Sequence, residues 1–235
     1  MAKLWAETLN ITSNPSGAAA AARSGNVVMI VDLIDMSTTA ESALEAGALD
    51  VLGASPDQNS EIPVSVNPEK MGYIAGKKAV KNDTEVIVAA EPRLVTADQD
   101  DSRLDGIQYV LKGIDKSGGI LGKVVSNLGR EVCKMADFEN KILIVVSASG
   151  GAAFDAAYNY GAPEVITGTV ARTNKMCGDE PAEAGAQRAL ELACKYECGI
   201  SIVAASSNSV EDILAAEYIG KKIMTHGFLD LDDNQ

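Results

Sequence analysis

The sequence is poor in histidine, in cysteine and in long apolar runs. His226 is the only histidine among 235 residues. A Ser-His-Asp or Cys-His mechanism therefore has a single candidate base, which lies beside Gly227 and near a polar tail, so this class of enzyme is disfavoured. The cysteines do not have the spacing of a zinc ribbon, and we expect buried free thiols, although the last two are close enough in sequence to touch: Cys133, Cys177, Cys194 and Cys198.

No segment supplies the ~18 consecutive apolar residues of a membrane-spanning helix. The run of small residues at 17–22 lacks the basic start and bulky apolar centre of a secretory signal. With 20 Lys+Arg against 33 Asp+Glu, the net charge is −13. Nucleic acids and anionic membranes bind to clustered cations, so we expect neither partner. The lack of a spanning or secretory segment predicts a cytoplasmic location. A few local arginines and backbone N–H groups can still bind a small anion.

Short apolar runs without alternation predict strands that are covered on both faces, at 27–31, 51–53, 63–66, 86–89, 142–146, 165–167 and 200–204. Helical patterns lie between them, at 39–46, 68–80, 120–135, 152–159, 182–196 and 210–219. Three signals mark helix starts: capping boxes at 38–41 and 209–212, and the pair Asn67-Pro68. Alternating strands and helices predict an α/β fold with a mostly parallel sheet and helices on both sides.

The sequence also contains an internal similarity. Residues 27–55 and 142–169 each have an apolar strand, a Ser/Thr/Gly loop, a short helix, a Gly-Ala turn and a second strand. The turns match as EAGALDV on NYGAPEV. All strand–helix–strand units look somewhat alike, but the shared turn favours duplication. We therefore expect two similar lobes, at 1–112 and 113–235.

Three polar loops follow predicted strands, and each leads into a helix. In parallel α/β sheets ligands bind beyond the carboxyl ends of strands, where helix N-termini offer free N–H groups to anions. Ser, Thr and Asn are also ordinary helix caps, so one such loop alone would carry no weight. Together they predict a site for a phosphate- or carboxylate-sized ligand, formed by Ser37, Thr38, Thr39, Ser147, Ser149, Gly150, Gly151, Ser206, Ser207 and Asn208.

Charged residues follow several strands at the same expected edge. Asp32 and Asp35 come after the first strand, where a carboxylate can hold a Mg²⁺ shared with a substrate phosphate. Asp35 can equally cap the loop. Glu91 and Arg93 follow the strand at 86–89, and Thr169, Arg172 and Asn174 follow the second unit. An arginine there can bind a phosphate through two hydrogen bonds, or can form a surface ion pair in an acidic protein; both interpretations stay open.

At these loops the chain resembles the 2-phosphosulfolactate phosphatase family. That family has a first-strand motif of the form D-V-L-R-A-T-T-T followed by N-G-A, which matches DLIDMSTT at 32–39 and EAGA at 45–48. Its T-T-T-N-G-T loop resembles VSASGG at 146–151, and its S-L-E-D-A segment resembles SVEDI at 209–213. The resemblance extends in the same order from residue 27 to residue 219. Asp35 stands where the family has an arginine. The family's G-N-S-P segment has no counterpart in this sequence.

The resemblance implies a three-layer α/β/α fold with two similar lobes. It also implies Mg²⁺-dependent hydrolysis of a phosphate monoester in coenzyme M biosynthesis. In this assignment Asp32 helps to hold the metal, Arg93 and Arg172 neutralise developing charge, and Glu91 is the general base to water. A closed homo-oligomer is the default assembly. Two alternatives remain: a non-catalytic anion-binding homologue, and a different reaction on the same scaffold, such as that of a lyase or isomerase acting on a carboxylate.

Overall fold

The computed structural model describes residues 4–57, 62–91 and 104–228. Its strands are β1 (Leu9–Ser13), β2 (Val27–Val31), β3 (Asp50–Ala54), β4 (Glu85–Ala90), β5 (Ile120–Ser126), β6 (Ile142–Val146), β7 (Val165–Gly168) and β8 (Ile200–Ala204). Its helices are α1 (Asn14–Arg23), α2 (Ser37–Glu45), α3 (Pro68–Lys81), α4 (Gln108–Ser117), α5 (Gly150–Asn159), α6 (Glu180–Tyr196) and α7 (Val210–Ile223). A 3₁₀ helix, η1 (Gly129–Lys134), and a π-helical turn, η2 (Met224–Phe228), complete these elements.

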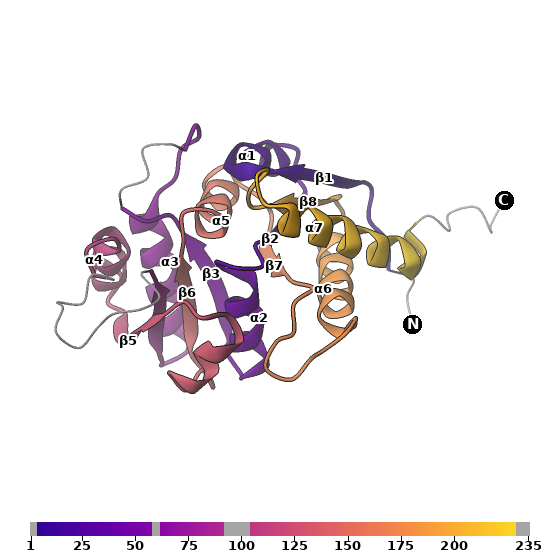
Figure 1. Ribbon diagram of the computed structural model, residues 1–235. Helices are drawn as coiled ribbons and strands as arrows, with labels where there is room; N and C mark the ends of the chain where they lie inside the picture. The colour runs from indigo at the N-terminus through magenta and orange to yellow at the C-terminus, as the bar shows by residue number, and fades with distance from the viewer. Residues whose placement is uncertain (1–3, 58–61, 92–103, 229–235) are drawn as a thin grey trace.

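The strands form two four-stranded sheets in which every pairing is parallel. One sheet has the order β1-β8-β2-β7 and the other has the order β3-β6-β4-β5. Helices α1, α2 and α5 lie between the sheets, α6 and α7 cover the outer face of the first, and α3 and α4 cover the outer face of the second (Figure 1). The predicted α/β class, with parallel strands and helices on both faces, is confirmed.

The chain crosses between the sheets through two of the central helices. Helix α2 connects β2 to β3, and α5 connects β6 to β7, so each of the two similar sequence segments begins in one sheet and ends in the other. Strand β2 pairs with β7, and β6 pairs with β3. Each sheet therefore takes strands from both 1–112 and 113–235. The duplication and the division into two lobes stay predictions.

The central strands are buried over their whole length, which explains their unbroken apolar sequences. All residues of β2, β6 and β8 are buried, because helices cover both faces of each sheet. Small side chains let the helices between the sheets approach closely. Helix α1 buries Ala18 and Ala22 and packs against α5, which buries Ala152 and Ala153.

Two of the three predicted helix starts have the expected caps. The side chain of Asn67 accepts the N–H of Lys70 at 3.0 Å, and the hydroxyl of Ser209 accepts the N–H of Asp212 at 3.2 Å. The capping box predicted at 38–41 is wrong, because α2 begins at Ser37 without a side-chain cap. The buried Glu41 instead accepts a hydrogen bond from Arg188 of α6 at 2.6 Å.

Other predictions of secondary structure are also wrong. The segment 120–135 is not a helix: Ile120–Ser126 pairs with β4 as an edge strand, and a 3₁₀ helix follows. Ile120 and Leu121 are both exposed at the surface of this strand, so its apolar residues do not alternate with polar ones. Their spacing therefore resembles that of a helix. Residues 63–66 form no strand, while β1, α1 and α4 were not predicted. The four cysteines are free, as expected, but only Cys198 is buried.

No helix within the described ranges is both long and apolar enough to pass through a bilayer.

Candidate functional site

Loops from both sheets meet at Asp32, directly after β2. Its carboxylate accepts the hydroxyl of Ser149 and the N–H of Gly150, both at 2.6 Å, from the loop after β6 in the other sheet. Its second oxygen accepts the N–H of Asp35 at 2.8 Å. The carboxyl ends of the two sheets therefore face the same end of the molecule, and the polar loops predicted at 32–39 and 147–151 converge.

The start of α5 already has a negative group bound to it, and that group is Asp32. The N–H of Gly150 donates to this carboxylate, and the N–H of Gly151 donates to the hydroxyl of Ser147 at 2.8 Å. A Cβ atom at position 150 would lie 2.5 Å from Asp32 Oδ2, so the contact requires glycine there. The two N–H groups that sequence reasoning assigned to a substrate phosphate are paired within the protein.

Asp32 is only 2% exposed, and burial raises the pKa of its carboxyl group. The hydrogen bonds from Ser149, Asp35 and Gly150 act in the opposite direction, while the neighbouring charge of Asp35 raises the pKa further. No lysine or arginine in the described part of the chain forms an ion pair with Asp32. This carboxylate is therefore held by neutral donors in a site that disfavours its charge.

The hydroxyls at the start of α2 organise the loop around Asp32. Ser37 donates to Ile30 O at 3.0 Å and accepts the N–H of Asp32 at 2.9 Å. Thr38 donates to Leu33 O at 2.8 Å, and its hydroxyl lies 3.1 Å from that of the buried Thr169. These hydroxyls are bonded to protein groups of the loop, although none of them caps α2.

Asn127, after β5, joins the same network. Thr39 donates to Asn127 Oδ1 at 2.6 Å, and the Asn127 amide donates to the carbonyl of Asp35. Asn127 is fully buried, so these bonds satisfy an otherwise costly polar group. Sequence reasoning missed this residue because the segment 120–135 was taken as a helix.

Asp212, at the start of α7, is the second residue that sequence reasoning missed. Its carboxylate accepts the N–H of Leu33 at 3.0 Å, which ties the third polar loop to the loop after β2. Burial raises the pKa of Asp212 to about 6, and the nearby charge of Asp32 adds to this rise, whereas the hydrogen bonds from Leu33, Ser209 and Ser206 oppose it. The sequence marked this residue only as part of a capping box, and nothing in that pattern says that it reaches across to Leu33.

A small pocket of about 190 Å³ opens beside this network. Asp35, Glu91 and Ser147 contribute its polar groups, and Pro56 and Ile107 are among its apolar walls. Asp35 and Glu91 come from different sheets, since they follow β2 and β4. The expectation that these two carboxylates lie near each other therefore agrees with the structure. Arg93, which was predicted beside them, lies outside the described residues.

A second, larger pocket of about 450 Å³ lies on the other side of the loop after β6. Ala148 lines both pockets. Ser149, Ser206 and Asn208 line the larger one, together with the β1–α1 junction around Asn14. The Asn14 side chain is bonded to Ser207, with its amide donating to the hydroxyl at 3.1 Å and its oxygen accepting the N–H at 2.9 Å. The predicted loop 206–209 is thus part of this end of the molecule.

Two residues predicted for the site, Asn174 and Arg172, lie away from the loops around Asp32. Asn174 lines a pocket with Ala46 and Cys133, at the C-terminal end of α2 and therefore away from the start of that helix, where Asp32 lies. The loop after β7 lies there because Lys175 donates its N–H to Glu45 at 2.7 Å. Arg172 is exposed on the way to this contact. The loop after β7 leaves the site at Thr169.

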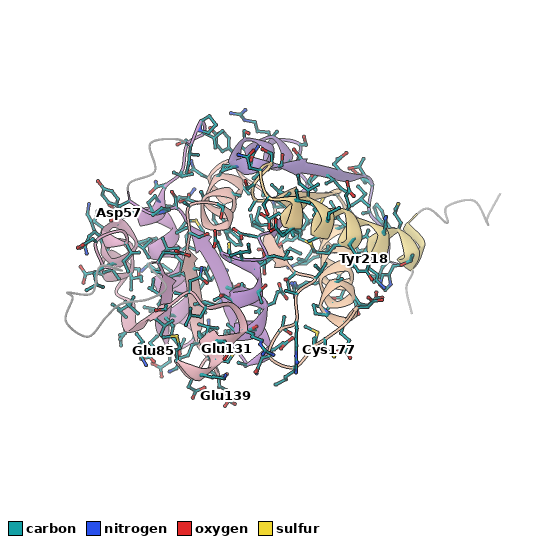
Figure 2. The ribbon with its side chains drawn as sticks, viewed as in Figure 1. Asp57, Glu85, Glu131, Glu139, Cys177 and Tyr218 are labelled. Atoms are coloured by element: carbon teal, nitrogen blue, oxygen red, sulfur yellow. The ribbon has the colours of Figure 1, made fainter. Side chains whose placement is uncertain are left out.

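The residues directly after β3 contact the start of α4. Asp57 lies beside α4 (Figure 2), and its carboxylate accepts the N–H groups of Gln108 at 2.5 Å and Tyr109 at 3.0 Å. These two hydrogen bonds satisfy free N–H groups at the start of α4, which has no side-chain cap at its N-cap residue. They also position Pro56 and Ile107 on the wall of the smaller pocket.

The resemblance implies Mg²⁺ at this edge of the sheets, where carboxylates gather. Within the described ranges, no three acidic, cysteine or histidine side chains gather as a complete metal centre. Mg²⁺ commonly uses one or two carboxylates plus phosphate oxygens and water, so a complete set is not required. Asp35 and Glu91 line the smaller pocket, and Asp32, whose two oxygens accept three hydrogen bonds from the protein, lies beside Asp35.

A scan against protein-family models found no match to this chain, and a search of curated proteins also found none.

Proposed function

We propose that this protein is a Mg²⁺-dependent phosphatase-like hydrolase of a small anionic phosphate ester. The observation that supports this most directly is the meeting of loops from both sheets at Asp32, with Asp35 and Glu91 beside it on a pocket of about 190 Å³. A pocket of this size suits a phosphate-sized group. Carboxylates in its wall would repel a phosphate unless a cation were bound between them.

Four residues in or beside this pocket have roles in the proposed reaction. Asp32 and Asp35 would hold Mg²⁺, which would neutralise charge on the phosphate oxygens when bound. Glu91 would accept a proton from the attacking water, because it lines the pocket from the opposite sheet. Ser149 would keep Asp32 oriented through its 2.6 Å hydrogen bond. Arg93 would supply further positive charge, as the sequence predicts, whereas Arg172 lies on the loop that leaves the site after Thr169.

The resemblance to the 2-phosphosulfolactate phosphatase family supports the proposal through the same residues. The family motif at 32–39 corresponds to the loop that carries Asp32 and Asp35, and the motif at 146–151 corresponds to the loop that donates to Asp32. Asp35 replaces the family's arginine and faces the pocket. This change removes a cation from the phosphate site, so the protein would depend more strongly on Mg²⁺.

The cytoplasmic location and the closed homo-oligomer are proposed with it. All four cysteines are free, which favours a reducing compartment. Light scattering on the purified protein tests the oligomer.

The deciding experiment is phosphate release from a panel of phosphorylated small acids, with Mg²⁺ and with EDTA. We expect turnover that requires Mg²⁺ and is lost in Asp32→Asn. If no member of the panel is hydrolysed, thermal shift separates the remaining possibilities. Stabilisation by an anion without dependence on Mg²⁺ would replace the proposal with the non-catalytic binder.

A further inference from the structure

The larger pocket is neutral in its described lining, in contrast to the acidic smaller pocket. Hydroxyls and amides come from Asn14, Ser16, Ser149, Ser206 and Asn208, and Pro63 is among its apolar walls. No described side chain that lines it is charged. A carboxylate or sulfonate placed there would find hydrogen-bond donors but no positive side chain to offset its desolvation.

The two pockets are also matched to groups of different size. The smaller, at about 190 Å³, accommodates a phosphate, whereas the larger, at about 450 Å³, lies within the ~300–1,000 Å³ range of pockets that bind small organic molecules. They share Ala148, and Ser149, the next residue, binds Asp32. The two pockets therefore adjoin at the loop after β6, and the inference places a phosphate in the acidic pocket and the rest of the same molecule in the neutral one.

The walls of the neutral pocket are held in place. Asn14 has a left-handed backbone, with φ of 67°, which is uncommon for a residue other than glycine. Its two side-chain hydrogen bonds to Ser207 fix the junction of β1 and α1 against the loop after β8. Ser206 in turn accepts the N–H of Asn208 at 3.1 Å. The pocket is thus formed before a ligand binds, which lowers the entropic cost of binding.

We propose that the neutral pocket binds an uncharged, hydroxyl-bearing group of sugar size, so that the substrate is a sugar phosphate rather than a small phosphorylated acid with further anionic groups. This inference rests on the proposed function for the position of the phosphate. The hydroxyls and amides would bond to the sugar hydroxyls, and Pro63 would contact the carbon face of the ring.

The test compares binding of ribose 5-phosphate and 3-phosphoglycerate by calorimetry, with Mg²⁺ present, in the wild type and in Asn208→Lys. Because a lysine supplies the missing cation, the variant should bind 3-phosphoglycerate about fivefold more tightly. Its affinity for ribose 5-phosphate should instead fall by about fivefold, because the substitution removes an amide proposed to bond to the sugar. Gln187→Lys, an exposed position on α6, controls for the added charge.

A second variant tests the occupancy of the pocket. Ser16 is exposed at the pocket, so the tryptophan of Ser16→Trp would fill it. The affinity for ribose 5-phosphate should fall at least about tenfold, and the affinity for inorganic phosphate should stay within about twofold of the wild type. Tighter binding of 3-phosphoglycerate than of ribose 5-phosphate by the wild type, or an unchanged ribose 5-phosphate affinity in Ser16→Trp, would overturn the inference. Because these are binding measurements, absence of turnover would reject the proposed hydrolase without rejecting the pocket.

Discussion

The buried carboxylate of Asp155, on α5, accepts the backbone N–H of Asn67 at 2.7 Å. The same side chain accepts the N–H of Ser55 at 3.3 Å, so it holds both ends of the loop between β3 and α3. That loop contributes Pro56 to the acidic pocket and Pro63 to the neutral one. A single carboxylate beneath the loop therefore helps to shape both halves of the candidate site.

Replacing Asp155 should change how stability depends on pH. Burial raises the pKa of Asp155 from 3.8 to about 6, despite the N–H groups of Asn67 and Ser55. Between these values the folded state keeps a proton that the unfolded state releases, so this residue makes the protein less stable as pH rises from about 4 to about 6, by roughly 3 kcal/mol. Above pH 6 its contribution is constant.

The variant Asp155→Asn removes this titration. It should therefore lose more stability at pH 4.5 than at pH 7, measured by urea unfolding at both values. Asp212, whose pKa also rises to about 6, acts in the same direction and remains in the variant. An equal loss at the two pH values would show that Asp155 titrates normally.

Breaking the ion pair between Arg188 and Glu41 should be strongly destabilising. Glu41 is 2% exposed, and it accepts hydrogen bonds from Arg188 at 2.6 Å and from Thr167 at 2.5 Å. Arg188→Met leaves this charge buried without its cation, which typically costs about 3–5 kcal/mol. The double variant with Glu41→Gln should recover part of the loss. A cost below ~1 kcal/mol for the single variant would mean that water replaces the arginine.

A methyl group at position 150 should disturb the site itself. The added Cβ would lie 2.5 Å from Asp32 Oδ2 and 2.8 Å from Met36 Cβ, so Gly150→Ala must push the two loops apart. We expect destabilisation of about 1–3 kcal/mol, with loss of the proposed activity. Gly106→Ala is the matched control, because a Cβ there meets nothing within 4 Å. If both variants unfold at the same temperature, the contact between the loops is looser than described.

Asp32→Asn should separate activity from folding. The amide keeps the shape of the carboxylate and removes the charge that is proposed to hold Mg²⁺, so phosphate release should fall by at least about 100-fold. The amide NH2 can no longer accept the N–H of Gly150 or Asp35, so stability should also fall, by about 1–3 kcal/mol, without unfolding the protein. Circular dichroism and the phosphate assay together decide this. Activity that survives the substitution would remove Asp32 from the mechanism.

Much of the fold followed from the sequence because the central strands leave no ambiguity. Runs such as VVMIV and ILIVV are apolar over their whole length, and their bounds were predicted as 27–31 and 142–146, as the structure has them. The edge strands β1 and β5 were missed because they are partly exposed and their sequences are mixed. Edge strands carry less of the hydrophobic pattern on which such a prediction depends.

The site was only partly predictable for a related reason. Position after a strand end was enough to find Asp32, Asp35, Glu91 and Ser149, because parallel strands bring their carboxyl ends to one edge. It could not show that Asp32 would occupy the start of α5, since the two lie 118 residues apart. The reach of Asp212 to Leu33 depends in the same way on how α7 packs.

The crossing of the chain through α2 and α5 has a consequence for how the protein can be made and divided. Strand β2 is among the first elements synthesised, yet both of its neighbours, β7 and β8, come from the last third of the chain. Strand β3 likewise cannot pair until β6 has been synthesised. A fragment that stops near residue 112 leaves β2 and β3 without their parallel partners. The ribosome must therefore release nearly the whole polypeptide before the first sheet can close, and the two halves expressed separately should regain structure only when mixed.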